Sequence, residues 1–256
     1  MSGQLTLLGV GASAGTPVVG CECSTCQSTN KKNYRTRCSS LLTLKNGKNI
    51  LIDTSPDLRL QSLREGLTSV DAVLFTHHHA DHCHGIDDLR AFCQINKKQI
   101  PLYGNQFSID ELNKKFQYAM TEPNGFWEVP ILKPNVINEP IKLFGQKIEP
   151  IPVFHGRSLI NGYRLGDMAY LTDTSKIPDT SMEQLRNLDV LLLDCLRNEP
   201  HPTHFSVKES LEVARELKAK KTILIHMTHD LEYDALSKLL PESIYVGYDG
   251  LKINVN

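Results

Sequence analysis

The chain has 256 residues, with 28 basic and 29 acidic side chains and a formal net charge of −1. This balance creates no overall field that would attract nucleic acid, so bulk nucleic-acid binding is not expected. No apolar run approaches the roughly 20 residues that cross a bilayer, so we expect no membrane association.

Short apolar strands recur along the chain and alternate with helical patterns. The first run, at 5–9, has no basic region before it, so we predict a strand there and not a signal peptide. Further strands are expected at 40–44, 49–53, 72–76, 100–104, 148–154, 169–173, 190–194, 222–226 and 244–248. Helices are expected at 56–64, 86–96 and about 206–218, the last opened by a capping box of Ser206 and Glu209. Strands mixed with helices throughout predict an α/β fold.

Polar residues end several of the predicted strands, namely Asp53, His77, Asp173, Asp194 and His226. Proteins of the α/β class place their chemistry on the loops that leave the sheet at such points. We therefore expect a functional site where these strands end.

The stretch 105–140 differs from the rest of the chain. It holds a possible helix at 110–120, followed by the only tryptophan, Trp127. It is either an insertion that covers the site or an ordinary surface excursion with its aromatic side chains packed into the core. We find no linker or internal repeat, so a single domain over residues 1–256 is expected.

A pattern His-x-His-x-Asp-His, formed by His77, His79, Asp81 and His82, joins a predicted strand to a predicted helix. Alternate residues of an extended chain point the same way, so His77 and His79 can face one cation. The following turn brings Asp81 and His82 towards a second cation. Imidazole and carboxylate suit zinc, manganese or iron. Exposed polar loop residues without metal are the alternative interpretation.

Four residues cannot complete two metal sites, so further ligands must come from elsewhere. His155, Asp173 and His226 each end an apolar strand. A lone histidine there is usually only hydrogen-bonded, but together with the cluster all three become candidate ligands. His78 and His84 are not needed as ligands.

This pattern resembles that of the metallo-β-lactamase-fold hydrolases, with seven positions matched in chain order from residue 77 to residue 226. The resemblance implies an αββα sandwich, in which two mixed β-sheets pack face to face with helices outside. It also implies one metal on three histidines, a second metal on three other ligands, and a bridging aspartate. The first metal would be bound by His77, His79 and His155. The second would be bound by Asp81, His82 and His226, and Asp173 would bridge the two metals.

Two further roles follow from the resemblance. Asp53 matches a carboxylate near the metal loop, where it would orient a ligand histidine by a hydrogen bond. Asp81 is expected to contribute to catalysis as well as to metal binding.

Two cations about 3.5–4 Å apart can activate water and stabilise both the attacking and the leaving oxygen. The expected reaction is therefore hydrolysis of an ester, an amide or a phosphodiester.

Three of the seven cysteines, Cys21, Cys23 and Cys26, lie close together near the N-terminus. The odd number and the crowding argue against a secreted disulfide framework and favour reduced thiols in a cytoplasmic protein. Three such thiolates can hold a structural zinc ion, which needs a fourth ligand. Cys38 and His229 are the candidates for it. Buried or redox-active thiols without metal are the alternative.

The C-x-C-x-x-C spacing narrows the resemblance to the PhnP-like phosphodiesterase branch of the family. The branch implies a structural zinc on the three cysteines, with His229, three residues after His226, favoured over Cys38 as the fourth ligand. Such a zinc would tie the N-terminal loop to the loop that carries His226. The other cysteines are expected to be small apolar core residues: Cys83, Cys93 and Cys195.

His201 and His204 precede the helix predicted to begin at Ser206. A histidine beside a phosphate at a helix N-terminus could protonate a leaving alkoxide. Phosphodiester cleavage needs such an acid because alkoxide is a poor leaving group. The PhnP-like and tRNase Z-like branches imply a histidine with this role here, and His204 matches it better than His201. A plain surface histidine is the alternative.

Together these features predict a hydrolase of small or cyclic phosphodiesters. A hydroxide held by two divalent cations, manganese or zinc, would attack phosphorus, and His204 would act as general acid. A structural zinc and a possible homodimer complete the expectation. A tRNase Z-like nuclease is an alternative, disfavoured by the near-neutral charge and the lack of an obvious basic arm. A metalloprotein of the PQQ-biosynthesis type, with an oxidative or carrier role, is another alternative.

Overall fold

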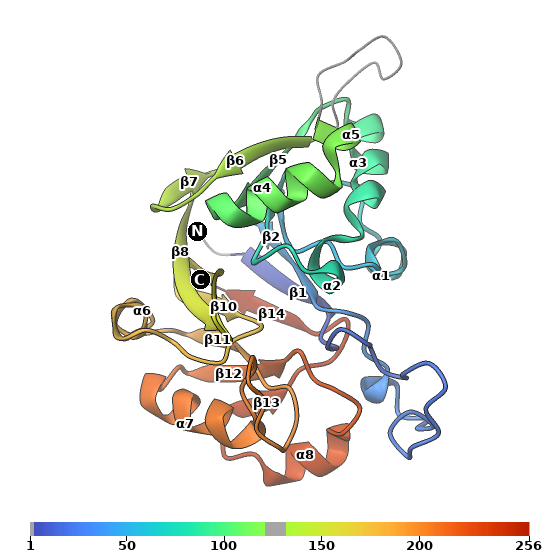
Figure 1. Ribbon diagram of the computed structural model, residues 1–256, viewed down its shortest axis with the longest axis vertical. Coiled ribbons are helices and arrows are strands. Elements are labelled where there is room, and N and C mark those ends of the chain that lie inside the picture. Colours follow the sequence, from blue (N-terminus) through green and yellow to red (C-terminus); the bar gives the residue numbers. More distant parts are fainter. Residues whose placement is uncertain (1–2, 121–131, 256) are drawn as a thin grey trace.

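The computed structural model describes residues 3–120 and 132–255, which form two facing β-sheets of seven strands each (Figure 1). The first sheet has the strand order β14-β1-β2-β3-β4-β5-β6. Its strands are β1 (Gly3–Gly9), β2 (Ser39–Leu44), β3 (Asn49–Ile52), β4 (Ala72–Leu74), β5 (Ile100–Gly104), β6 (Leu132–Val136) and β14 (Lys252–Val255). The second sheet has the order β13-β12-β11-β10-β9-β8-β7. Its strands are β7 (Ile141–Leu143), β8 (Gln146–His155), β9 (Ser158–Leu165), β10 (Met168–Leu171), β11 (Val190–Asp194), β12 (Lys221–Ile225) and β13 (Ile244–Val246).

Helices lie on the outer sides of the two sheets (Figure 1). Those beside the first sheet are α1 (Leu58–Glu65), α2 (Ala80–Cys83), α3 (Leu89–Asn96), α4 (Gln106–Lys115) and α5 (Gln117–Met120). Those beside the second sheet are α6 (Asp179–Gln184), α7 (Val207–Leu217) and α8 (Tyr233–Leu239). This arrangement confirms the predicted αββα sandwich. Within the described ranges, no helix is long and apolar enough to cross a membrane.

Alternating burial explains why the strands of the first sheet are apolar along their whole length. In β3, Ile50 and Ile52 belong to the core between the two sheets. Leu51, on the opposite face, belongs to a second core shared with Leu58 of α1 and Leu89 of α3. A strand buried on both faces has no polar side, so its sequence is a continuous apolar run.

The parallel part of each sheet determines where the polar strand ends lie. Strands β3 to β6 are parallel neighbours in the first sheet, and β10 to β13 are parallel neighbours in the second. The carboxyl ends of parallel strands lie at one edge of a sheet, where open α/β sheets bind ligands. Asp53 and His77 follow β3 and β4 in this way, and Asp173 and His226 follow β10 and β12.

The helices differ from their predicted bounds for local reasons. The predicted helix at 56–64 begins at Leu58, after Asp57 as N-cap. The predicted helix at 86–96 divides into a short 3₁₀ segment, Ile86–Asp88, and α3. The predicted helix at 110–120 begins earlier, at Gln106, because the Asn105 side chain caps it by accepting from the Ser108 N–H. It then breaks at Phe116, which leaves the helical backbone region.

The described part of the stretch 105–140 belongs to the sandwich. Helix α4 follows β5 and leads to β6, which pairs with β5 in parallel at the edge of the first sheet. Residues 121–131, including Trp127, lie outside the described residues. Strand β9 was not predicted because polar Asn161 and Gly162 interrupt its apolar pattern, although it pairs with β8 along its full length.

Removal of the capping box at the start of α7 should destabilise the protein measurably. The Ser206 hydroxyl accepts from the Glu209 N–H, and the Glu209 carboxylate accepts from the Ser206 N–H at 2.8 Å. Ser206→Ala should therefore lower the free energy of unfolding by about 1 kcal/mol, as measured by urea denaturation. Ser237→Ala, in exposed α8, is the control. An equal effect of both substitutions would show that the box contributes no specific stability.

Candidate functional site

Three residues at the polar edge of the sandwich have backbones in the left-handed region. Asp53, Asp173 and His226 have φ values of 58°, 53° and 59°. Such conformations in non-glycine residues cost roughly 1–3 kcal/mol each and gather at functional sites. Asp53 and His226 directly follow β3 and β12, and Asp173 lies two residues after the end of β10, so each sharp turn occurs where a strand ends.

The first group of candidate ligands consists of His77, His79 and His155, each of which offers a ring nitrogen within 4.8 Å of the others. The ring centroid of His79 lies 4.5 Å from the ring centroid of His77 and 5.1 Å from that of His155. His155 donates from Nδ1 to the Thr203 carbonyl at 2.9 Å, which leaves its Nε2 for a metal. His79 is exposed, so this group can be reached from outside.

The second group contains Asp81, His82, Asp173 and His226, again within 4.8 Å of one another. Asp173 Oδ1 lies 3.1 Å from His82 Nε2 and 3.4 Å from His226 Nε2. Its other oxygen, Oδ2, lies 3.8 Å from His77 Nε2 in the first group. Asp173 therefore stands between the two groups, where a bridging ligand would be.

Buried ring nitrogens show that these groups suit cations. Nε2 of His77, His82 and His226 is buried and has no hydrogen-bond partner in the described part of the chain. Leaving a buried polar atom unpaired costs about 1–3 kcal/mol, and a metal ion would satisfy each of these atoms. Imidazole with carboxylate is a donor set for zinc, manganese or iron. The residues present therefore fit two divalent cations.

The protonation states at His77 and Asp173 suit ligation directly. Burial, with the neighbouring His82, lowers the pKa of His77 well below its usual value, so this imidazole is neutral. Burial alone would raise the pKa of Asp173, but His226 and His82 outweigh it, and the pKa lies well below the usual range. A neutral imidazole and an ionised carboxylate are the forms that bind a metal. At His82 and His226 burial would lower the pKa, but Asp173 and the other nearby carboxylates outweigh it and raise the pKa of both rings, so a cation would displace a proton from each.

Asp53 holds His82 in place. Nδ1 of His82 donates to Asp53 Oδ2 at 2.7 Å, which turns Nε2 towards the second group. The same carboxylate accepts from the Thr76 N–H and hydroxyl, both at 2.8 Å. A carboxylate behind a ligand histidine fixes the orientation of the ring and raises its basicity.

His204 lies beside both groups and is held by Asp194. Nδ1 of His204 donates to Asp194 Oδ2 at 3.3 Å, and Nε2 lies 3.9 Å from Asp173 Oδ2. Asp194 is fully buried and also accepts from the N–H groups of Phe205 and Thr174. Sequence reasoning placed Asp194 at a strand end without a role, and no sequence signal linked it to His204.

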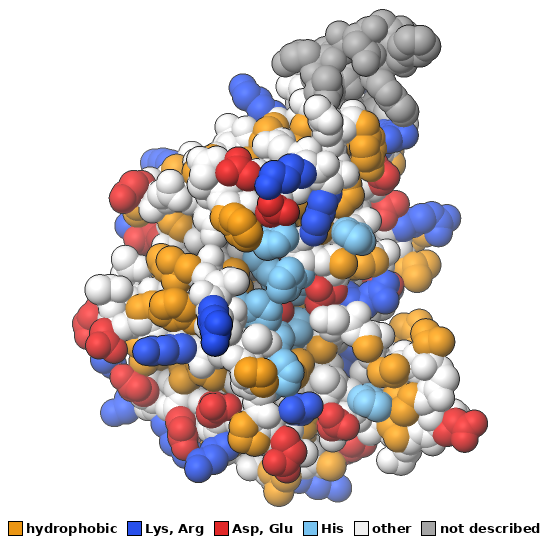
Figure 2. All heavy atoms as spheres, in the orientation of Figure 1, with side chains coloured by type: hydrophobic (Ala, Val, Ile, Leu, Met, Phe, Trp, Pro, Cys, Tyr) orange, Lys and Arg blue, Asp and Glu red, His pale blue; other side chains and the backbone are white. Residues whose placement is uncertain are grey.

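Figure 2 shows histidine side chains gathered along a line across the centre of one face of the molecule. His78 and His84, which neighbour the motif residues in sequence but are not candidate ligands, point elsewhere. The His78 ring packs edge-on against Phe107 at 5.1 Å, and the His84 ring packs against Phe116 at 5.9 Å. His201 lies further out than His204, with ring centroids 5.2 Å apart.

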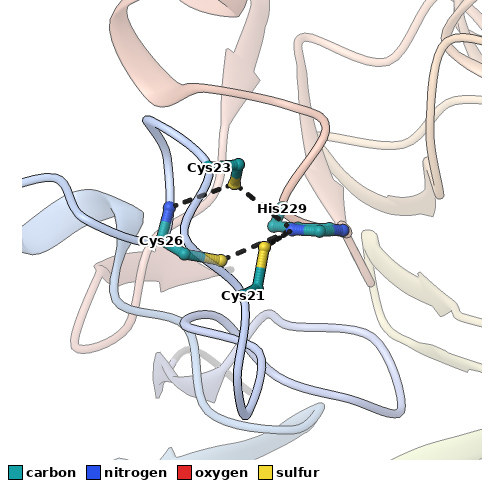
Figure 3. A group of neighbouring side chains, drawn as sticks. All are labelled: Cys21, Cys23, Cys26 and His229. Carbon is teal, nitrogen blue, oxygen red and sulfur yellow. Dashed lines mark hydrogen bonds between the residues drawn. The ribbon is translucent and has the colours of Figure 1, made fainter.

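The cysteine cluster is a separate group (Figure 3). Nδ1 of His229 lies 3.2 Å from the Cys21 sulfur and 3.4 Å from the sulfurs of Cys23 and Cys26. The Cys26 N–H points at the Cys23 sulfur and lowers the pKa of that thiol to about 6, which favours the thiolate at Cys23. Burial raises the pKa of the Cys26 thiol to about 11, so a metal ion would displace its proton on binding. Cys38 is instead buried in the core between the sheets, so His229 is the fourth member of the cluster.

The remaining cysteines divide by burial. Cys83 and Cys195 are fully buried, as expected of core residues. Cys93 is only half-buried and packs at the margin of the outer core, so its prediction as a core residue holds only in part.

Loss of one cysteine ligand should release a structural metal. Cys21→Ser should remove one zinc equivalent and lower the melting temperature by several degrees, because a closed zinc site contributes directly to folding. Metal analysis combined with calorimetry measures both effects. Cys93→Ser, outside the cluster, is the control and should keep its zinc. Full zinc content in Cys21→Ser would contradict a metal at this cluster.

Comparison with known proteins defines the family. A family described as the beta-lactamase superfamily domain matches residues 48–227. A solved structure, described as a new diphosphatase from the PhnP family, is 43% identical and superposes with a TM-score of 0.93. The similarity covers 99% of this chain and 98% of that chain. The chain belongs to the PhnP family. This PhnP-family chain has the metallo-β-lactamase fold.

Two other proteins are similar to this PhnP-family chain. A curated relative from Porphyromonas gingivalis, named octanoyltransferase, is 37% identical over 251 residues. The match covers 96% of this chain, which spans about half (50%) of the length of that relative. Zinc-bound PqqB from Methylobacterium extorquens is 18% identical, with coverage of 98% and 100% and a TM-score of 0.79. At that identity it shows a shared fold alone.

Proposed function

We propose that this PhnP-family protein hydrolyses phosphodiester bonds of small molecules, with diphosphate diesters among the candidate substrates. The observation that carries the proposal is the position of His204, whose Nε2 lies 3.9 Å from Asp173 and which is held from behind by Asp194. The diphosphatase that is 43% identical to this chain supports phosphorus–oxygen cleavage as the chemistry. Two divalent cations, zinc or manganese, would supply an activated water and neutralise charge on the phosphoryl group.

The chain's own residues would place the substrate between the two groups of ligands. His79 is exposed while His77, His82 and His226 are buried, so the phosphoryl group enters from the His79 side. Asp173 lies between the groups, close to His77 of the first and His82 of the second, and so fixes the position of one group relative to the other. Oriented groups of this kind stabilise the charge that develops in the transition state without reorganising.

His204 would hold a proton on Nε2 and pass it to the leaving oxygen. Its Nδ1 donates to the buried Asp194 carboxylate, which fixes the orientation of the ring and leaves Nε2 as the nitrogen that can serve the substrate. Its Nε2 faces the space between the ligand groups, where a leaving alkoxide would form. A proton donor at this place is useful for phosphodiesters, because alkoxides are poor leaving groups.

A substrate panel tests the proposal. The purified protein, loaded with zinc or manganese, is assayed with bis(p-nitrophenyl) phosphate, cyclic nucleotides, cyclic sugar phosphates and a dinucleoside diphosphate. We expect turnover of at least one diester that disappears after metal removal and returns with metal. Metal-loaded protein that cleaves none of them contradicts the proposal.

The two alternative functions differ from the proposal in their readouts. A tRNase Z-like nuclease would cleave a precursor tRNA in preference to small diesters, and the net charge of −1 does not favour it. A metalloprotein of the PQQ-biosynthesis type would show an oxygen-reactive iron centre or ligand binding without diester turnover. We favour small-molecule hydrolysis because of the 43% identical diphosphatase.

The curated relative is named for a different activity, octanoyl transfer. We propose that octanoyl transfer belongs to the part of that protein which this chain does not match, because the match spans only 50% of its length. The chain alone should then transfer no octanoyl group while still hydrolysing a diester. Octanoyl transfer that is lost with the metal ligands would contradict this assignment.

A further inference from the structure

Ser13 contacts a candidate metal ligand from outside the motif. Its hydroxyl donates to Asp81 Oδ2 at 2.7 Å, although 68 residues separate the two in sequence. The same carboxylate oxygen lies 3.4 Å from His82 Nε2 and 3.6 Å from His226 Nε2. Ser13 therefore touches the oxygen of Asp81 that faces the two ligand imidazoles.

The loop that carries Ser13 is fixed on both sides. The Gly11 N–H donates to the Thr36 carbonyl at 2.8 Å, and the Ala12 N–H donates to the Met227 carbonyl at 3.1 Å. The Thr16 N–H donates to the Arg35 carbonyl at 2.8 Å. Gly11 also packs so closely that a Cβ there would lie 2.7 Å from the Arg35 carbonyl oxygen. The Ser13 hydroxyl is thus presented at a set position beside the strand end that carries His226.

Asp81 needs such a partner. A carboxylate turns easily about its last side-chain torsion, which has broad minima. Asp81 lies on α2, a helix of only four residues, so its own element does little to hold the side chain. A hydrogen bond to one oxygen selects the orientation in which that oxygen faces His82 and His226.

We propose that Ser13 is a positioning residue for Asp81, and that it raises the affinity of the group Asp81, His82 and His226 for its cation. This inference rests on the proposed metal centre and adds to it a residue that comes from the N-terminal loop. Hydrogen-bond partners of metal ligands typically change metal affinity by about 10–100-fold. Ser13 acts through Asp81 and takes no part in the reaction itself.

Zinc release measures the effect without an activity assay. Wild type, Ser13→Ala, Ser13→Thr and the control Ser237→Ala are loaded with zinc and titrated with a chelator of known affinity. In Ser13→Ala, one zinc equivalent should leave at a chelator concentration about 10-fold lower than in the wild type. Ser13→Thr keeps the hydroxyl and should behave like the wild type. Ser237, whose hydroxyl donates to the Tyr233 carbonyl of its own helix, should have no effect on release.

Each other outcome has a definite meaning. Release from Ser13→Ala at the wild-type concentration overturns the proposal. Earlier release of all equivalents together, with a lower urea midpoint, also overturns it, because Ser13 would then support the fold as a whole. A wild-type protein with zinc only at the cysteine cluster overturns the metal centre and this inference together. A wild type that shows the predicted release pattern but cleaves no diester overturns the proposed function alone.

Discussion

Asp173→Asn should lower diester hydrolysis by about 10³-fold or more, the largest loss expected from any single substitution. Several kcal/mol of transition-state stabilisation depend on the cations, and each 1.36 kcal/mol corresponds to about a factor of ten in rate. Asp173 faces both ligand groups, so loss of its negative charge weakens both at once. Asparagine keeps the volume and tolerates the positive φ of 53° at this position, so the backbone should not change.

The measurement combines initial rates with metal content. We expect Asp173→Asn to hold less zinc or manganese than the wild type under the same dialysis conditions. Asp167→Asn, in the exposed turn before β10, is the matched control and should keep both activity and metal. Wild-type activity in Asp173→Asn would show that this carboxylate is not shared between two cations.

His204→Ala should give the second largest loss, and the size of that loss should depend on the leaving group. General acid catalysis contributes typically about 10²–10⁴-fold. A loss of this size is expected for a diester with an alkyl leaving group, which needs a proton. A p-nitrophenolate leaves without one, so its release should slow far less. Measurement of kcat for both esters, with metal content, gives the ratio directly.

The metal content of His204→Ala distinguishes a proton donor from a metal ligand. His204 also lies close enough to His155 and Asp173 to form a third group that could hold a metal. Loss of a metal equivalent in His204→Ala would therefore identify His204 as a ligand, and equal losses for both esters would argue against a proton donor. His201→Ala is the control, because its half-exposed ring lies outside that group.

The metal motif could be predicted because its chemistry is local. His77, His79, Asp81 and His82 share one short turn, so their residue types and spacing already place them together. The more distant His155, Asp173 and His226 were found from their positions at the ends of apolar strands and from the family pattern. The capping box of Ser206 and Glu209 was equally predictable, since its two members are three residues apart.

Other parts of the site had no local signal. Ser13 and Asp81 meet because the loop after β1 is hydrogen-bonded to Met227, just after β12, and to the segment before β2. Thr203 supports His155 through a backbone carbonyl, which any residue type could offer. Asp194 looked like one of several polar strand ends. The helix at 110–120 was misplaced because its N-cap, Asn105, lies before the region with the helical pattern.

The sequence by itself determined the ligand chemistry, the layered fold and the family pattern, because residue type and periodicity act over a few neighbouring positions. The family pattern also implied that Asp53 supports a ligand histidine, but only the tertiary structure decided which histidine that is and which other groups support the site. Asp53 behind His82, Asp194 behind His204 and Ser13 beside Asp81 are contacts across 29, 10 and 68 residues. Such pairs form where strands from two sheets end at a common edge, and the packing of the sheets sets that meeting point.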